Sequence, residues 1–138
     1  MIKFILGKSG SGKTKYMIEN ANKEKSRGNG NIVFIDTDDA HIFTLDYAVR
    51  LINAKKYGVK NLDTLIGFIS GIVSRDYDIE KIYLDGLYEI MTFSEKDLRE
   101  LIERLNVLSK ENGLDIFIGL ENEKSDLPED LDVEVEVL

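Results

Sequence analysis

The segment GKSGSGKT at residues 7–14 is the part of the sequence whose residue types and spacing most clearly indicate chemistry. It matches the pattern G-x-x-x-x-G-K-[ST], and the apolar run Ile2–Leu6 precedes it. Glycines allow successive backbone N–H groups to point into one concavity, which suits a bound anion. Lys13 would reach the β and γ phosphates of a nucleotide, and the Thr14 hydroxyl would ligate Mg²⁺. The segment therefore predicts a site for a nucleoside triphosphate, ATP or GTP, together with Mg²⁺.

The predicted phosphate contacts extend from the glycine-rich loop into the helix expected after it. The N-terminus of that helix, near Gly12, would direct its electropositive end at the phosphates. A glycine-rich turn without a ligand is the alternative, and the strand-loop-helix context makes it the weaker one. The residues assigned to phosphate binding are Gly7, Lys8, Ser9, Gly10, Ser11, Gly12, Lys13, Thr14 and Lys15.

With this motif the chain resembles the P-loop NTPase superfamily, and the resemblance covers most of its length. The resemblance implies a second motif, a hydrophobic strand that ends in an aspartate and orders Mg²⁺ through water. The run Lys81-Ile82-Tyr83-Leu84-Asp85 fits it, so Asp85 is implied to form the metal site together with Thr14. The alternative for Asp85 is a strand-end residue that caps a turn with Gly86.

Two further stretches resemble RecA-like ATPases within this superfamily. Residues 84–87, Leu-Asp-Gly-Leu, are similar to the strand end at which a small residue follows the aspartate. Residues 34–40 look like the stretch after the second strand, where that family has the glutamate that activates water. The resemblance therefore implies that Asp38, which is one methylene shorter than glutamate, orients the attacking water.

Besides Lys13, three carboxylates are candidate catalytic groups. Asp38 is the first choice. Glu89 follows Asp85 by four residues, whereas many related ATPases place a glutamate directly after that aspartate. Glu121 ends a predicted strand at a point where the family often has a polar side chain near the γ phosphate. The alternative for Asp38 and Glu121 is a solvated strand exit without a catalytic role.

Composition restricts the remaining classes of function. The chain has 138 residues, 26 acidic against 18 basic side chains, a net charge of −8 and no cysteine. Disulfides and thiolate metal sites are thereby excluded, and autonomous nucleic-acid binding is not expected because it usually requires a basic surface. The apolar stretch Leu65–Val73 is far shorter than the ~20 residues of a membrane span, and the N-terminal run is too short for a signal peptide. We expect a cytoplasmic protein without membrane contact.

Strand-like runs alternate with helical patterns, which predicts βαβ units and a mostly parallel sheet. The predicted helices cover Lys13–Lys25, Asn61–Arg75 and a segment that begins at a Ser94 cap and stops at Gly113. The predicted strands are Ile2–Leu6, Ile32–Asp36, a weak one at Arg50–Ile52, Ile82–Asp85, Leu114–Leu120 and Val133–Val137.

We therefore expect one α/β domain over residues 1–138 with the three-layer P-loop NTPase fold: a mostly parallel five-stranded sheet with helices on both faces. The RecA-like resemblance implies the strand order 5-1-4-3-2, in which one strand separates the Ile82 strand from the Ile2 strand. Direct pairing of those two strands would favour a kinase-like fold instead. The alternating run Val133–Val137 suits an edge strand, parallel or antiparallel.

The leading functional prediction is Mg²⁺-dependent ATP or GTP binding with slow hydrolysis, as an NTPase or a nucleotide switch. A kinase for small molecules or nucleotides is the first alternative, but it usually needs an arginine-bearing lid, and the five arginines are scattered along the sequence. The second alternative is a non-catalytic nucleotide-binding subunit, completed by a protein partner or by another copy of the chain. Arg50 or Arg75 could then act across the interface.

The layout also resembles small stand-alone bacterial ATP-binding proteins that are loosely labelled twitching-motility-type ATPases. This resemblance implies ATP binding and the fold, and no pathway. Three aromatic residues, Tyr16, Phe43 and Tyr47, could stack on a nucleotide base, although aromatic side chains in such positions more often belong to the core.

Overall fold

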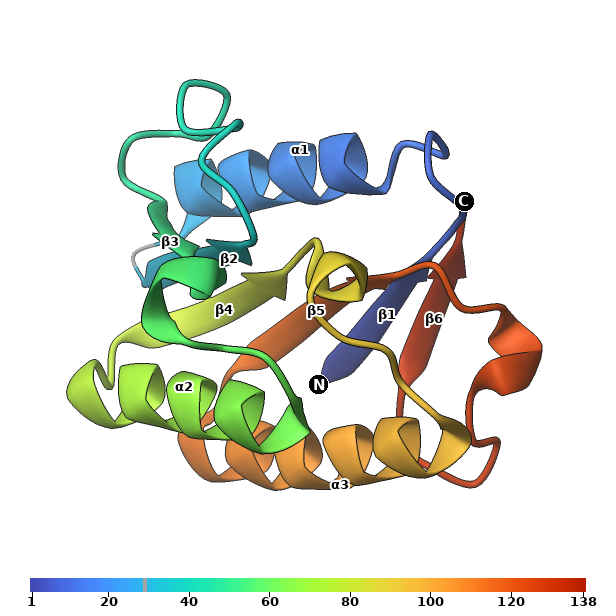
Figure 1. The fold of residues 1–138 in the computed structure, drawn as a ribbon. Helices are drawn as coiled ribbons and strands as arrows, with labels where there is room; N and C mark the ends of the chain where they lie inside the picture. The colour runs from blue at the N-terminus through green and yellow to red at the C-terminus, as the bar shows by residue number, and fades with distance from the viewer. Residues whose placement is uncertain (29) are drawn as a thin grey trace.

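The structure is a computed structural model that describes residues 1–28 and 30–138 (Figure 1). The described helices are α1 (Lys13–Arg27), α2 (Leu62–Arg75) and α3 (Glu95–Asn112), with short 3₁₀ turns η1 (Ala54–Tyr57), η2 (Leu87–Glu89) and η3 (Lys124–Asp126). The strands are β1 (Ile2–Leu6), β2 (Asn31–Asp36), β3 (Arg50–Asn53), β4 (Ile79–Leu84), β5 (Asp115–Leu120) and β6 (Glu134–Val137).

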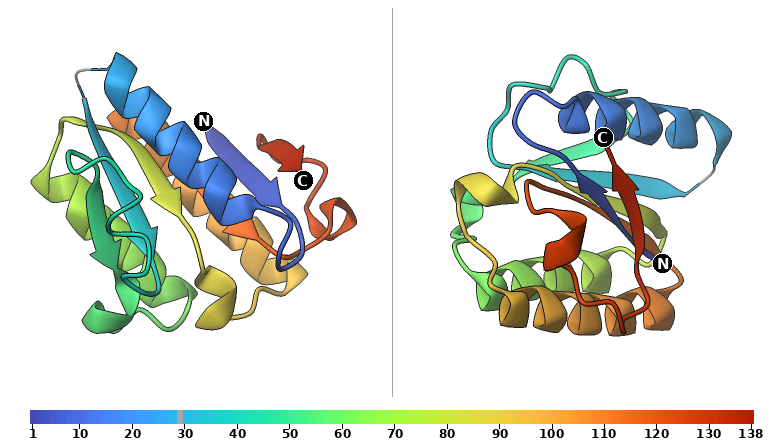
Figure 2. Two further views of the ribbon diagram at one scale, coloured as in Figure 1. Left: turned by 90° about the horizontal axis from the view of Figure 1, so that it is seen from above. Right: turned by 90° about the vertical axis from the view of Figure 1, so that its right-hand side faces the viewer.

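All six described strands belong to one parallel sheet in the order β3-β2-β4-β5-β1-β6. Helix α1 covers one face of this sheet, and α2 and α3 cover the other (Figures 1 and 2). The expected α/β architecture, a parallel sheet between helical layers, is confirmed. Because all strands run the same way, their C-terminal ends meet at one edge, where α/β folds place ligands.

The predicted count of five strands is wrong, and the observed order differs from 5-1-4-3-2 because a sixth strand, β3, is added beside β2; the other five strands keep the predicted relative order. Residues Arg50–Asn53, expected at most to form a weak strand, pair with β2 along their whole length and form one edge of the sheet. An edge strand needs little hydrophobic signal because only one neighbour covers it. At the other edge β6 is parallel to β1, and β5 separates β4 from β1 as the RecA-like resemblance implied.

Helix boundaries follow local signals in the sequence. Ser94 accepts a hydrogen bond from the Asp97 N–H while the Asp97 carboxylate accepts one from the Ser94 N–H, so the capping box at the start of α3 is present. Gly113 ends α3 in the left-handed conformation, with φ 62°. Asn61 forms a second capping box with Thr64 and is the cap of α2 rather than its first residue.

The apolar core lies in two layers that the sheet separates. The larger one fills the space between the sheet and helices α2 and α3, and the smaller one lies under α1. In the smaller layer the ring of Tyr83 stacks on Phe117, with 4.6 Å between ring centres, and on Phe34 at 5.7 Å. This rigid sheet supports the loops at its C-terminal edge. None of the described helices has the length and apolar character that crossing a membrane would require.

Candidate functional site

The glycine-rich loop connects β1 to α1 at the C-terminal edge of the sheet, as the sequence predicts (Figure 1). Gly10 has φ 84° and Gly12 has φ 93°, a conformation that other residues rarely adopt. A Cβ atom at either position would meet nothing within 4 Å, so both glycines face open space. A pocket of about 320 Å³ lies there. Its lining residues are Ser9, Gly10, Gly12, Lys13, Thr14, Lys15 and Tyr88.

Lys13 is buried with only 4% of its surface exposed, although it carries a positive charge. Its Nζ donates hydrogen bonds to the carbonyl oxygens of Gly7, at 2.7 Å, and Lys8, at 3.2 Å. Among the described residues no carboxylate forms an ion pair with it. A buried ammonium group without an anionic partner is costly, so this loop is suited to an anion supplied from outside.

Thr14 and Asp85 are in direct contact, although 71 positions separate them in the sequence. The Thr14 hydroxyl donates to Asp85 Oδ2 at 2.6 Å, and Asp85 is 2% exposed. The other oxygen, Oδ1, accepts the Gly86 N–H at 2.9 Å, so Asp85 also caps the turn as the alternative interpretation proposed.

The Thr14 and Asp85 pair fits the needs of Mg²⁺. This ion takes oxygen ligands and, at phosphate sites, uses one or two protein groups together with waters and phosphate oxygens. The Thr14 hydroxyl, which lines the phosphate pocket, and the buried Asp85 carboxylate that it contacts form such a donor set. The described residues contain no cluster of three or more histidine, cysteine, aspartate or glutamate side chains placed for a metal.

Two site residues that we did not select from the sequence are Asp36 and Thr37, at the end of β2. Both are buried, with 4% and 2% of their surfaces exposed. Burial raises the pKa of Asp36 to about 6; the hydrogen bond from the Thr37 N–H opposes this rise, and repulsion from Asp85 adds to it. The sequence did contain a signal for Asp36: like Asp85, it directly follows an apolar, strand-like run.

Gly86 explains why a small residue follows Asp85. It has φ 73°, and a Cβ atom there would lie 2.5 Å from Thr37 Oγ1 and 3.0 Å from Asp36 Oδ1. A side chain at this position would therefore separate the ends of β4 and β2. The glycine allows the two acidic strand ends to approach each other beside the phosphate loop.

None of the three candidate carboxylates lines the phosphate pocket. Asp38 is exposed, and its Oδ1 accepts the Ala40 N–H at 2.9 Å. Glu89 accepts the Thr37 hydroxyl at 2.9 Å. Glu121 is exposed at the end of β5, in a separate pocket beside the other side of the loop. The structure thus brings Lys13, Thr14 and Asp85 together, whereas Asp38, Glu89 and Glu121 lie outside the lining of the pocket.

Tyr88 is a further residue of the pocket that the sequence did not single out. It belongs to η2, directly after the Asp85-Gly86 turn, and is half-buried. Its ring centre lies 5.3 Å from Lys13 Nζ, within the range of a cation–π contact. Burial raises the pKa of the phenol to about 12, and repulsion from Asp85, Glu121, Glu89 and Asp36 adds to the rise.

A second pocket, of about 510 Å³, adjoins the phosphate pocket and shares Thr14 and Lys15 with it. It lies between α1 and the segment 37–49, and its other lining residues are Ile18, Glu19, Asn22, His41 and Thr44. On the same segment Phe43 and Tyr47 are 96% and 100% exposed. The expectation that these two aromatic residues belong to the core is therefore wrong, whereas Tyr16 packs partly buried against the smaller core layer.

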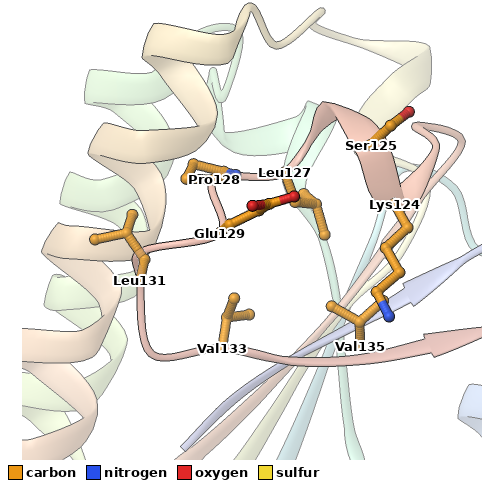
Figure 3. A pocket seen from close by; sticks show the side chains of 8 residues that line it. All are labelled: Lys124, Ser125, Leu127, Pro128, Glu129, Leu131, Val133 and Val135. Atoms are coloured by element: carbon orange, nitrogen blue, oxygen red, sulfur yellow. The ribbon is translucent and has the colours of Figure 1, made fainter.

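A third pocket lies away from the loop, between β6 and the segment 124–133 (Figure 3). It measures about 540 Å³ and shares no residue with the phosphate pocket. Its walls are mainly apolar, with Leu127, Pro128, Leu131, Val133 and Val135 around it.

No protein-family profile matches the chain, and a search of curated proteins found no match.

Proposed function

We propose that this protein binds a Mg²⁺–nucleoside triphosphate, ATP or GTP, at residues 7–15 and hydrolyses it slowly. The observation on which this proposal rests is the contact between the Thr14 hydroxyl and the Asp85 carboxylate. This contact supports the proposal because it joins the hydroxyl and the carboxylate that Mg²⁺ would need, beside a loop whose left-handed glycines face open space. The cytoplasm, which supplies such nucleotides, is the proposed location.

Lys13 has the central role in binding. In the described state its ammonium group donates to two loop carbonyls. Phosphate oxygens carry more charge than carbonyl oxygens, so Lys13 would exchange one set of acceptors for a stronger one. The backbone N–H groups of the loop and the N-terminus of α1 would bind the remaining phosphate oxygens. Thr14 and Asp85 would hold Mg²⁺, which supplies neutralising charge to the phosphates.

The nucleoside is proposed to occupy the pocket between α1 and the segment 37–49. This pocket shares the lining residues Thr14 and Lys15 with the phosphate pocket. It offers the apolar side chain of Ile18 together with the polar groups of Asn22 and His41, a combination typical of small-molecule sites.

Slow turnover is expected because two catalytic parts are missing from the pocket. No carboxylate lines it, and no arginine lines it among the described residues. P-loop enzymes depend on an oriented water and on neutralised phosphate charge, so a site without either part is weakly active. A protein partner or a second copy of the chain is proposed to supply the missing positive charge. The strand β5 between β1 and β4 disfavours the kinase alternative, since the kinase-like fold pairs those strands directly.

Calorimetry with MgATP and MgGTP tests binding directly. A single-turnover assay on Asp38→Asn, Glu89→Gln and Glu121→Gln then tests the water-orienting group, with Asp38→Asn expected to bind nucleotide normally and to hydrolyse more slowly. If only Glu89→Gln or Glu121→Gln is inactive, the assignment to Asp38 is wrong. Equal trace rates in all three variants would identify a nucleotide-holding module. Phosphorylated metabolites in place of free phosphate would indicate a kinase.

A further inference from the structure

Tyr88 reaches the phosphate pocket because of the turn that carries it. Gly86, with φ 73°, redirects the chain directly after the metal-site aspartate. The next residue, Leu87, is fully buried and anchors η2 in the core. Tyr88 follows and lines the phosphate pocket, whereas the other described residues that line it belong to residues 9–15. Tyr88 is therefore the wall that faces the loop.

The Tyr88 hydroxyl is available to a ligand. Among the described residues it makes no hydrogen bond, in contrast to the Tyr83 hydroxyl, which donates to Asn20. Besides the Lys13 ammonium group over its ring, the charged groups that act on Tyr88 are carboxylates: Asp85, Glu121, Glu89 and Asp36. Carboxylates repel phosphate, so a neutral hydroxyl is the group on this wall that can donate to a phosphate oxygen.

We propose that Tyr88 contacts the terminal phosphate of a bound nucleoside triphosphate through its hydroxyl, and so distinguishes triphosphate from diphosphate. This inference rests on the proposed function. The terminal phosphate is one of the two phosphates that Lys13 would reach, and the Lys13 ammonium group lies over the Tyr88 ring. The neighbouring Glu89 accepts the hydroxyl of Thr37, so the turn that carries Tyr88 is connected to the end of β2.

The test compares the affinities for MgATP and MgADP in the wild-type protein, Tyr88→Phe and the matched control Tyr77→Phe, at a residue that is 92% exposed. Tyr88→Phe keeps the ring over Lys13 and removes only the hydroxyl. A hydrogen bond to a charged group is worth about tenfold or more in affinity. We therefore expect Tyr88→Phe to lose about tenfold in MgATP affinity with its MgADP affinity unchanged, and Tyr77→Phe to match the wild type.

Tyrosine fluorescence provides a second readout, because the chain contains six tyrosines and no tryptophan. MgATP should change the emission of the wild type and of Tyr77→Phe more than MgADP does, and this difference should vanish in Tyr88→Phe. Unchanged affinities in Tyr88→Phe, or equal losses for both nucleotides, would overturn the role of Tyr88 and leave the proposed function intact. A wild-type protein that binds neither nucleotide would overturn both.

Discussion

The phosphate pocket and the apolar pocket beside β6 differ in what they cost the folded protein. The first is smaller, about 320 Å³ against 540 Å³, yet its lining includes the buried charge of Lys13, and the buried Asp85 contacts its lining residue Thr14. The second is bounded mainly by apolar groups that continue the core (Figure 3). Burying charge is unfavourable unless a partner compensates it. Buried charged side chains, and not the size of the cavity, therefore distinguish the candidate site from the apolar pocket.

Lys13→Ala should have the largest effect. Removing the ammonium group deletes charged hydrogen bonds to phosphate, so the affinity for MgATP should fall by about 100-fold in calorimetry. Folding should be little affected, because the deleted charge is buried without an anionic partner. Lys23→Ala on the exposed side of the same helix is the control and should bind like the wild type. Unchanged MgATP affinity in Lys13→Ala would show that the buried charge of the phosphate pocket does not identify a nucleotide site.

Leu127→Ala tests the apolar pocket. Leu127 is 7% exposed and packs against the larger core layer, so its truncation should lower the free energy of unfolding by about 2–3 kcal/mol. Nucleotide affinity should stay the same, which denaturant unfolding and calorimetry together would show. Val107→Ala, at a position that is 55% exposed, should change stability very little. A loss of nucleotide binding in Leu127→Ala would mean that the two regions are coupled.

Asp36→Asn tests the cost of buried charge in the site. Because the pKa of Asp36 rises from 3.8 to about 6 on folding, the folded state keeps a proton that the unfolded state has lost. The free energy of unfolding should therefore fall as pH rises between these values, and stay lowered above pH 6. Asp36→Asn should remove this pH dependence and stabilise the protein at pH 7 by about 1–2 kcal/mol.

Thermal or denaturant unfolding between pH 3.5 and 7 measures this effect. Asp78→Asn at an exposed position is the control and should keep the wild-type slope. If stability depended on pH in the same way in Asp36→Asn and in the wild type, burial would not raise the pKa of Asp36.

Ser94→Ala should give the smallest effect. The variant removes one hydrogen bond of the α3 capping box, which is away from both pockets, and should cost about 1 kcal/mol of unfolding free energy. Nucleotide affinity measured by calorimetry should not change. A larger loss of unfolding free energy would show that Ser94 stabilises the protein by more than this one capping hydrogen bond.

Local signals in the sequence predicted much of the fold and the phosphate loop. Gly10 and Gly12 could be recognised because the spacing of glycines in this motif reflects a backbone conformation. The ends of α3 at Ser94 and Gly113 could be predicted because each depends on a few neighbouring residues. Strand β3 was underestimated for the opposite reason: as an edge strand, it has a weak pattern and depends on β2 for its hydrogen bonds.

The sequence by itself determined the backbone of the phosphate loop and the residues that would bind phosphate, because glycine spacing and a lysine-threonine pair act over a few positions. Only the tertiary structure decided that Asp36 and Thr37 adjoin Asp85 and that Tyr88 faces Lys13. These contacts join the ends of separate strands, and they depend on strand order, on the turn at Gly86 and on burial. Such quantities arise from packing between distant segments, which no local pattern of residue types encodes.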